Sequence, residues 1–222
     1  MKTYSTVPPA MVDGWTTRDS THPPLEQVPF HFHDAEEWLE VLRGQMTFYS
    51  LSGQARTLAA ASVLRIPRGE VHRAEIGPEG VSYRMYVPVD STTGFTKPLS
   101  DDEIDLLRKN LAFPVEEEKK TDDAAKFFEP LLANDLAFGR ADLNVIGKKS
   151  YLEEFTARDR SSSRTISVLN RSDNGILVST VVTTGTNTPA PKYFTNIRLF
   201  VKEGSDWRLR VWVNYPAQSD GT

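Results

Sequence analysis

Three of the chain's four histidines lie in two short segments that could supply ligands to one metal ion. His31 and His33 flank Phe32 in PFHFHDAEEWLEVLRG, and His72 ends the segment IPRGEVH, whereas His22 lies outside both. Residues i and i+2 of a β-strand project to the same face, so His31 and His33 can both point into the interior of a sheet protein. The pair alone is more typical of surface histidines on an exposed strand, and the third histidine favours the metal site.

A carboxylate follows the histidine pair closely along the chain. Glu37 can reach the same centre if DAEE forms a turn, and Glu36 and Glu40 compete with it on composition alone. Three imidazoles and a carboxylate, without a thiolate, suit Fe, Mn, Co, Ni, Cu or Zn. An octahedral ion bound in this way keeps two positions open for substrate, water or dioxygen, which is typical of a catalytic site.

The two segments together resemble the paired motifs of the cupin family. The motifs H-x-H-x3-E-x6-G and P-x-G-x2-H are matched at every fixed position, by His31, His33, Glu37, Gly44, Pro67, Gly69 and His72. The resemblance covers about residues 25–90 and implies a six- to eight-stranded double-sheet barrel with one divalent transition metal ion inside. It also implies His31, His33, Glu37 and His72 as the ligands, and so selects Glu37 from its neighbours.

Three positions depart from the family pattern. Leu25 and Ala61 stand where glycines are expected six residues before the first histidine and before Pro67, and Ile76 stands where an asparagine is expected after His72. These are turn or packing positions. The departures therefore concern loop geometry more than metal ligation.

Side chains around the metal should select the substrate. Alternation along SYRMYVP turns one of two sets inward, either Ser82, Arg84 and Tyr86 or Tyr83, Met85 and Val87. The first set would bind an acid and the second would line a dry pocket, and one misjudged turn residue exchanges them. The segment QMTFYSL presents the same choice, between Met46 with Phe48 and Thr47 with Tyr49. The candidate pocket residues are Arg84, Tyr86, Phe48 and Tyr49, and no substrate is implied.

The elements around these residues change along the chain. Short β-rich segments with turn residues between Val28 and Val89 predict an all-β sandwich or small barrel. Ser100 and Glu103 form a capping box for a helix that we expect to end before Pro114. We therefore expect a barrel with an N-terminal arm at 1–95, a linker with one helix at 96–120 and a second domain at 121–217.

The second domain is predicted to be α+β. Helical stretches are expected at 122–138, where Pro130 would kink or end the helix, and at 148–159. Four segments with period-two patterning follow from Arg164 and predict an antiparallel meander. A curved sheet that wraps its helices is the expected arrangement.

This half resembles the NTF2-like superfamily in its SnoaL-like or DUF4440-type branch. The shared features are a short helix leading to an Asp-containing strand, G-K-x-x-[YF]-L at 147–152 and W-R-L-x-x-W-x-N-x-P at 207–216. The resemblance implies a cone-shaped cavity and frequent dimerisation through the sheet face. Candidate cavity residues are Asp142, Tyr151, Tyr193 and Asn214, together with Arg198 and Trp212.

Composition excludes several classes of partner and chemistry. The net charge of the 222 residues is -4 and the pI is about 5.6, so the basic surface that nucleic acid requires is not expected. No cysteine is present, which excludes disulfides and thiolate ligands. No signal segment or membrane span is predicted, and we expect a soluble cytoplasmic homodimer.

The resulting hypothesis is a metal-dependent enzyme that acts on a small organic molecule. A dioxygenase-type oxidoreductase is favoured. The alternatives are a metal-assisted isomerase, decarboxylase or lyase, or a non-catalytic protein that binds or senses a small ligand.

Overall fold

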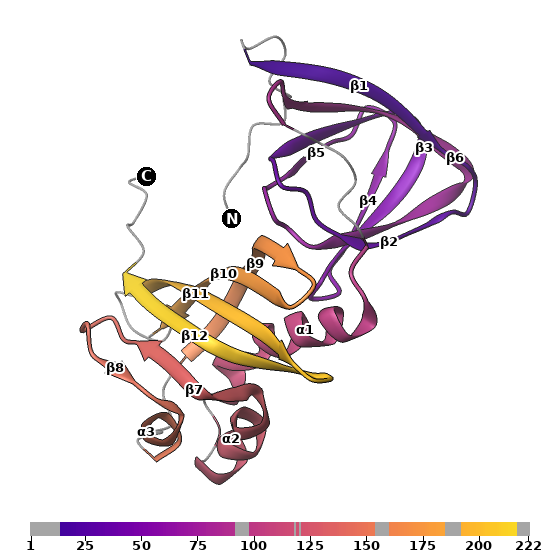
Figure 1. Ribbon diagram of the computed structural model, residues 1–222. Coiled ribbons are helices and arrows are strands. Elements are labelled where there is room, and N and C mark those ends of the chain that lie inside the picture. Colours follow the sequence, from indigo (N-terminus) through magenta and orange to yellow (C-terminus); the bar gives the residue numbers. More distant parts are fainter. Residues whose placement is uncertain are drawn as a thin grey trace. The chain divides into compact units, whose positions relative to one another are not determined.

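The chain divides into two compact units, Met1–Asp105 and Leu106–Thr222 (Figure 1). The computed structural model describes residues 14–91, 98–117, 119, 121–153, 160–184 and 192–216, with backbone only at 121 and 160–165. The division falls within helix α1, Asp101–Glu116. Among the described residues, no helix is long and apolar enough to cross a membrane.

The first unit is built on two long strands that pair with each other. Its strands are β1 (Trp15–His22), β2 (Gln27–His31), β3 (Glu37–Ser50), β4 (Ala55–Ala59), β5 (Val63–Ile66) and β6 (His72–Pro88). β6 also pairs with β1 and β2, and β3 also pairs with β4 and β5, so each long strand carries two short ones. Figure 1 shows these strands curving around a common interior. The all-β fold expected for this part of the chain is confirmed.

β3 and β6 are each one long continuous strand, whereas the sequence predicts short β-rich segments separated by turn residues. Pairing between them moves from Gly44↔Val81 to Met46↔Ile76, so residues 77–80 of β6 bulge out of the ladder. Gly44 has φ +77°, and a Cβ there would lie 2.0 Å from the carbonyl oxygen of Gly80. The glycines therefore permit a close backbone crossing inside long strands, where a turn between separate strands was predicted.

β1 is a strand that the sequence does not predict. Its residues WTTRDSTH are mostly polar, and the strand pairs antiparallel with β6 from Trp15↔Pro88 to His22↔Val81. Main-chain hydrogen bonds to β6 hold this edge strand in place, so its side chains need not alternate between apolar and polar. The sequence of β1 therefore lacks the period-two pattern by which a strand is predicted. Residues 1–13 of the expected arm lie outside the described residues.

The interior of the first unit is apolar. Side chains from β3, β4 and β6 alternate inward and form one buried cluster of Leu39, Val41, Met46, Leu58, Ile76, Val81 and Tyr83. Val28, Phe48, Leu64 and Met85 pack against this cluster. The histidines discussed below therefore lie beside a water-poor core.

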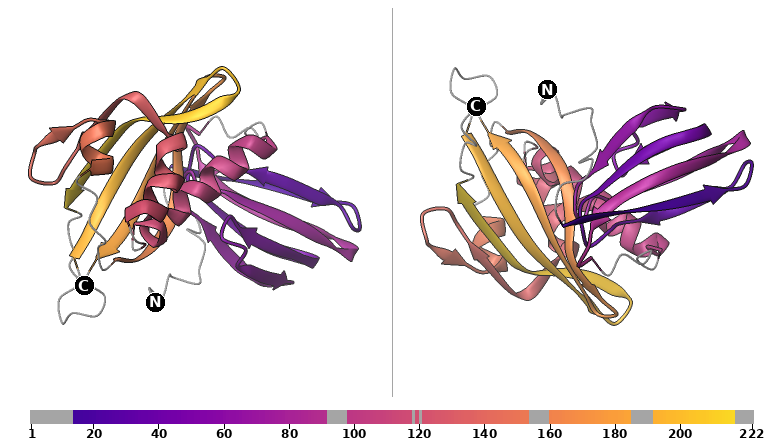
Figure 2. Two further views of the ribbon diagram at one scale, coloured as in Figure 1. Left: turned by 90° about the horizontal axis from the view of Figure 1, so that it is seen from below. Right: turned by 90° about the horizontal axis from the view of Figure 1, so that it is seen from above.

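The second unit is a mixed six-stranded sheet with helices. Its elements are α2 (Thr121–Phe128), the 3₁₀ helix η1 (Glu129–Leu131), β7 (Leu132–Gly139), β8 (Val145–Ile146), α3 (Lys148–Glu153), β9 (Arg160–Ser172), β10 (Gly175–Thr184), β11 (Lys192–Glu203) and β12 (Asp206–Pro216). The strand order is β8-β7-β12-β11-β10-β9. β9 to β12 form the predicted antiparallel meander, but β7 pairs parallel with β12. Figure 2 shows the helices on one face of this sheet.

Two predicted helices of this region need correction. The stretch at 122–138 is helical only to Leu131, because Pro130 lies in the 3₁₀ turn and the chain continues as β7. The helix α1 passes Pro114 and ends at Glu116, where the buried Leu107 and Phe113 hold its inner face. The third predicted helix is α3, and its expected continuation at 154–159 lies outside the described residues.

Aromatic side chains fill the space between this sheet and its helices. Trp212 of β12 is fully buried and its ring centroid lies 4.4 Å from that of Phe138, 5.5 Å from that of Tyr151 and 5.6 Å from that of Phe113. These contacts join α1, α3, β7 and β12 into one core. The resemblance of this unit to the NTF2-like superfamily stays a prediction.

Candidate metal centre

The three histidines of the two motif segments lie together in the first unit. β2 pairs with β6 so that His31 stands directly opposite His72, and their ring centroids are 4.4 Å apart. His33 follows the end of β2, with its ring centroid 4.9 Å from that of His31 and 5.2 Å from that of His72. One potential ligand nitrogen from each histidine lies within 4.8 Å of the others, and all three side chains are buried. This arrangement could hold a metal ion.

Backbone hydrogen bonds orient two of these imidazoles. Nδ1 of His31 lies 2.8 Å from the carbonyl oxygen of Pro29, and Nδ1 of His72 lies 2.9 Å from that of Glu70. A carbonyl oxygen only accepts, so Nδ1 carries the proton in both rings and Nε2 keeps its lone pair. A metal-ligating histidine characteristically donates its second ring N–H in this way.

Glu37, the first residue of β3, contacts the third histidine. Its Oε1 lies 3.2 Å from Nδ1 of His33, and Glu37 is 4% exposed. The contact is compatible with two roles, because the carboxylate can accept from His33 and orient that ring, or it can bind the same ion from an adjacent position. His33 is itself held in place by the Gly69 N–H, which donates to its carbonyl oxygen at 2.8 Å.

The electrostatics of the site favour the arrival of a cation. Burial, with a smaller contribution from His31, lowers the pKa of His33 to about 4, and burial also lowers the pKa of His31 and His72. Burial and then the charge of Asp34 raise the pKa of Glu37 to about 7. The imidazoles are thus neutral at neutral pH and can donate lone pairs, and a divalent cation would favour the ionised form of Glu37. The donor set fits a transition metal ion.

The three histidines line a small, mostly apolar pocket. The pocket volume is about 40 Å³, measured as the space that the centre of a water molecule can reach. This volume leaves room for a few water-sized groups. The remaining lining residues are His22, Val28, Glu37, Leu39, Met46, Phe48, Ile66, Ala74, Ile76, Tyr83 and Met85. Phe48 stacks on His72 with ring centroids 5.0 Å apart. None of the described lining residues is a lysine or an arginine.

Three of the four residues predicted to line this pocket point elsewhere. Arg84 donates to Asp19 at 2.7 and 2.9 Å, and the Tyr86 hydroxyl donates to Glu40 at 2.6 Å. The Tyr49 hydroxyl donates to Glu75 at 2.8 Å. Tyr83, Met85, Met46 and Phe48 line the pocket in their place, so odd-numbered residues of β6 face inward after the bulge at 77–80, and even-numbered residues of β3 face inward after Gly44. The bulge at 77–80 sets this parity, and the sequence alone could not choose it.

Two polar residues of the pocket, His22 and Tyr83, were not predicted as site residues. His22 ends β1, the strand that lacks a period-two pattern, and its partner Tyr83 is distant in sequence. Tyr83 does appear in one of the two alternating sets considered for SYRMYVP. For His22 the sequence carries no comparable signal, because its place depends on the pairing of β1 with β6.

The candidate residues of the second unit occupy different environments. Asp142 is exposed in the turn between β7 and β8, where it accepts from the Asn144 backbone N–H at 3.1 Å and from the Asn144 side chain at 3.0 Å. Tyr193 is 37% exposed on β11. The prediction that these two line an enclosed cavity is therefore corrected, since the first stabilises its own turn and the second lies at the surface.

Of the other candidates of this unit, Tyr151, Arg198 and Trp212 belong to its core, and Asn214 is half-buried beside it. The Tyr151 hydroxyl donates to the buried Glu117 at 3.1 Å, and Asn214 accepts from the Trp212 indole N–H at 2.6 Å.

Arg198 is 1% exposed and its guanidinium lies 4.4 Å from the ring centroids of both Phe113 and Trp212. It donates to Asn110 at 2.6 Å and to Asn196 at 3.2 Å. These contacts describe a polar network inside the aromatic core.

Several solved structures resemble part of this chain at low identity: a cupin-2 domain containing protein from Shewanella frigidimarina (21% identity, 36% of this chain and 74% of that chain, TM-score 0.31); the DMSP lyase DddQ from Ruegeria pomeroyi (22%, 38% and 43%, 0.35); and the polyketide cyclase RemF from Streptomyces resistomycificus (24%, 45% and 72%, 0.35). No curated protein matches the chain in sequence. The model of the Cupin_2 family, described as a cupin domain, matches residues 20–83. This segment contains β2 to β5, most of β6 and all three clustered histidines, and it is a cupin domain.

Proposed function

We propose that the cupin domain is a metal-dependent enzyme that acts on a small, largely apolar organic molecule. The observation that carries this proposal is the cluster of three buried imidazoles, each with a potential ligand nitrogen within 4.8 Å of the others, at the polar part of an otherwise apolar pocket. Buried imidazoles crowded in this way lower one another's basicity, so a shared cation is the simplest partner for their lone pairs.

Four side chains would hold one divalent transition metal ion. His31 and His72 would bind through Nε2, because their Nδ1–H groups donate to the backbone, and His33 with Glu37 would complete the shell. When bound, such an ion supplies Lewis-acid polarisation of a substrate oxygen or activation of dioxygen.

The walls of the pocket indicate the kind of molecule that fits. Leu39, Met46, Ile76 and Met85 exclude water from the bound molecule, and Phe48 packs beside His72. Since no lysine or arginine is among the described lining residues, the pocket favours an uncharged ligand over a polyanion. The available volume further favours a small molecule, or the small reactive end of a larger one.

Within this class we favour a dioxygenase-type oxidoreductase. The support is the donor set, since imidazoles and a carboxylate accept redox-active iron and leave positions open. Metal-assisted isomerase, decarboxylase or lyase chemistry is the alternative for the same site. Iron in the purified protein, with oxygen uptake in the presence of catechols, flavonols, diketones or small acids, would support the dioxygenase; zinc, manganese or nickel without oxygen uptake would support the alternative.

Metal analysis of the protein purified without added metal tests the whole proposal. We expect about one transition metal ion per chain in the wild type, and little in His31→Ala and His72→Ala. The matched control is His22→Ala, which removes the fourth histidine and should keep its metal. Near-ultraviolet circular dichroism checks that the variants are folded. The proposal is wrong if the wild type neither contains nor takes up a stoichiometric metal ion, or if the control loses metal as fully as the other two variants.

A further inference from the structure

The histidine outside the metal cluster belongs to a second polar group of the same pocket. Nε2 of His22 lies 3.0 Å from the Tyr83 hydroxyl, and Nδ1 of His22 lies 2.8 Å from Oε2 of Glu26. The two rings are nearly parallel, with an angle of 10° between their planes. His22 stands opposite Val81 in the β1–β6 ladder, so His22 and Tyr83 are diagonal neighbours on one face of the sheet. Both side chains line the pocket of the three clustered histidines.

The chemistry of the partners sets the direction of these hydrogen bonds. An ionised carboxylate only accepts, so Glu26 holds the His22 proton on Nδ1. In neutral His22 the other nitrogen, Nε2, is then an acceptor, and the Tyr83 hydroxyl donates to it. The Tyr83 oxygen can accept further hydrogen bonds, and Ser20 provides one of them. A donor group in the pocket could therefore approach the Tyr83 oxygen while the Tyr83 proton points at Nε2 of His22.

The backbone holds this group in place. The Ile76 N–H donates to the Glu26 carbonyl oxygen at 2.9 Å, and the Leu25 N–H donates to that of Gly77 at 3.2 Å. Gly80 has φ +76°, and a Cβ there would lie 2.9 Å from the carbonyl oxygen of His22. The β1–β2 turn is thus fastened to the bulge of β6, the same feature that sets the inward parity of Tyr83.

Exposure rises in steps along the three side chains. Tyr83 is 3% exposed, the His22 side chain is 16% exposed and the Glu26 side chain is 39% exposed. The hydrogen bonds run from Tyr83 through His22 to Glu26, and exposure to solvent increases in the same order. The three side chains therefore connect the buried pocket with solvent. Burial raises the pKa of Tyr83, so its hydroxyl is protonated at neutral pH and a free phenolate is not the working species.

We propose that Tyr83, His22 and Glu26 form a proton relay that serves the metal pocket. A substrate O–H, or an acidic C–H beside a carbonyl group, transfers its proton to the Tyr83 oxygen while the Tyr83 proton moves to Nε2 of His22. The resulting imidazolium passes its Nδ1 proton to Glu26, which releases it to water, so one proton leaves the substrate and one reaches solvent. No phenolate forms at any stage, and the reverse sequence delivers a proton to the pocket.

The relay rests on the proposed function for its substrate, and it narrows the class of that substrate. A small uncharged molecule with an oxygen function for the metal and an acidic O–H or C–H for Tyr83 satisfies both polar parts of the pocket. Proton abstraction beside a polarised carbonyl is the step that isomerases and lyases require. The relay therefore adds weight to that branch of the proposed chemistry.

The exchange of the Tyr83 hydroxyl proton with solvent tests the relay without a known substrate. Isotope-shifted ¹³Cζ signals of tyrosine in mixed H₂O and D₂O give this exchange rate in the full-length protein, measured both as purified and after metal removal. We expect fast exchange in the wild type despite the burial of Tyr83, and slowing by about tenfold or more in His22→Gln and in Glu26→Gln. Glu75→Gln, which neutralises the hydrogen-bond partner of the half-buried Tyr49, should leave the exchange rate of Tyr83 unchanged.

The two variants separate the relay from simple damage to the fold. Glu26→Gln keeps both rings and the turn. Slower exchange of the Tyr83 proton in this variant would therefore support the relay even if His22→Gln is poorly folded. Slow exchange in the wild type, or an unchanged rate in Glu26→Gln, would overturn the relay and leave the metal site untouched. Conversely, a wild type without metal that still shows fast exchange and slowing in both variants would keep the relay and reject the metal-dependent enzyme.

Discussion

Nδ1 of His33 and Oε1 of Glu37 lie 3.2 Å apart in a part of the pocket where both residues are buried. Burial lowers the pKa of the imidazole to about 4 and raises that of the carboxyl to about 7. The contact therefore joins a neutral imidazole to a carboxyl that is hard to ionise, and it is not an ion pair of two charged groups. Ionisation of a buried carboxyl without a nearby cation costs free energy. The effect of Glu37 on protein stability can therefore be measured without a substrate.

Replacement of Glu37 by glutamine should stabilise the metal-free protein at high pH. Because the pKa of Glu37 is raised in the folded state, the wild type loses stability as the pH rises from about 4.5 to about 7, and the loss is complete above that range. We expect Glu37→Gln to exceed the wild type by about 3 kcal/mol in the free energy of unfolding at pH 8, and to match it below pH 4.5. Urea unfolding across this pH range measures the difference.

A bound divalent metal should reverse this order. The cation favours the carboxylate, so the metal-loaded wild type should be more stable than the metal-loaded variant at pH 8. Glu75→Gln, which alters a half-buried carboxylate that accepts hydrogen bonds from Arg73 and Tyr49, should show no gain in the metal-free protein. Equal stabilities of wild type and Glu37→Gln at pH 8, with and without metal, would contradict the role given to this carboxyl.

Gly44 should tolerate no side chain. A Cβ at this position would lie 2.0 Å from the Gly80 carbonyl oxygen, at a φ of +77°. We expect Gly44→Ala to lower the free energy of unfolding by about 3 kcal/mol or more, because the clash adds to the backbone strain. Gly53→Ala is the matched control: its φ is +85° and nothing lies within 4 Å of a Cβ, so strain alone should cost about 1 kcal/mol. Similar losses in both variants would show that the crossing of β3 and β6 is not tight.

Leu25 and Ala61 should gain stability on replacement by glycine. Their φ angles are +62° and +67°, so the chain keeps a left-handed conformation at the two positions where the cupin pattern has glycine. Leu25→Gly and Ala61→Gly should each raise the free energy of unfolding by about 0.5–1 kcal/mol, because relief of strain exceeds the added entropy of the unfolded chain. Ala55→Gly in the exposed strand β4 is the control and should lose about 0.5–1 kcal/mol. A loss in all three variants, seen in thermal or urea unfolding, would refute this expectation.

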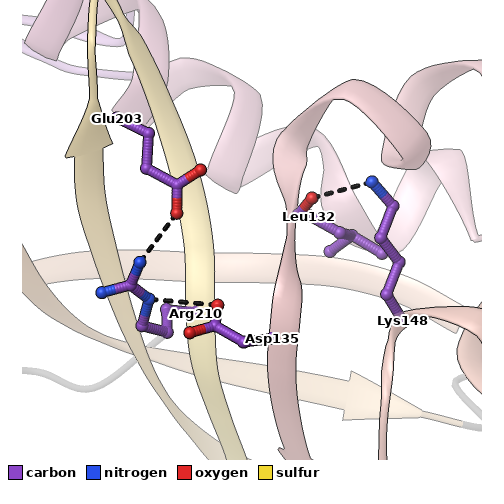
Figure 3. A network of polar contacts seen from close by, with 5 residues as sticks. All are labelled: Leu132, Asp135, Lys148, Glu203 and Arg210. Carbon is purple, nitrogen blue, oxygen red and sulfur yellow. Dashed lines mark hydrogen bonds and ion pairs between the residues drawn. The ribbon is translucent and has the colours of Figure 1, made fainter.

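Arg198 should matter far more to the second unit than Arg210. Arg198→Met removes the guanidinium N–H groups that donate to the buried side-chain oxygens of Asn110 and Asn196. We expect this change to lower the free energy of unfolding by about 3 kcal/mol. Figure 3 shows Arg210 between Asp135 and Glu203, with nitrogen to oxygen distances of 3.2 and 2.8 Å. That network is exposed to solvent, so Arg210→Met should cost less than about 1 kcal/mol. Comparable losses for both variants would mean that the buried network contributes little.

Local patterns were sufficient where neighbours in sequence decide the outcome. The motif spacing singled out His31, His33 and His72 as three imidazoles that lie together, although His33 follows the end of β2 and is not placed by strand alternation. The meander of β9 to β12 followed from period-two patterning and turn residues. Pro130 marked the end of a helix, although the strand after it read as more helix, because Leu132, Leu136 and Phe138 suit the inner face of either element.

The sequence by itself determined the all-β first unit, the α+β class of the second and the set of histidines that the structure brings together, because strand alternation and the spacing within each motif are short-range properties. Only the tertiary structure decided which face of β6 lines the pocket, since the bulge at 77–80 sets the register between β3 and β6. Only the tertiary structure placed His22 beside Tyr83, because the pairing of β1 with β6 joins residues 61 positions apart. Pairing between distant strands depends on the closure of the whole sheet, and no local pattern encodes it.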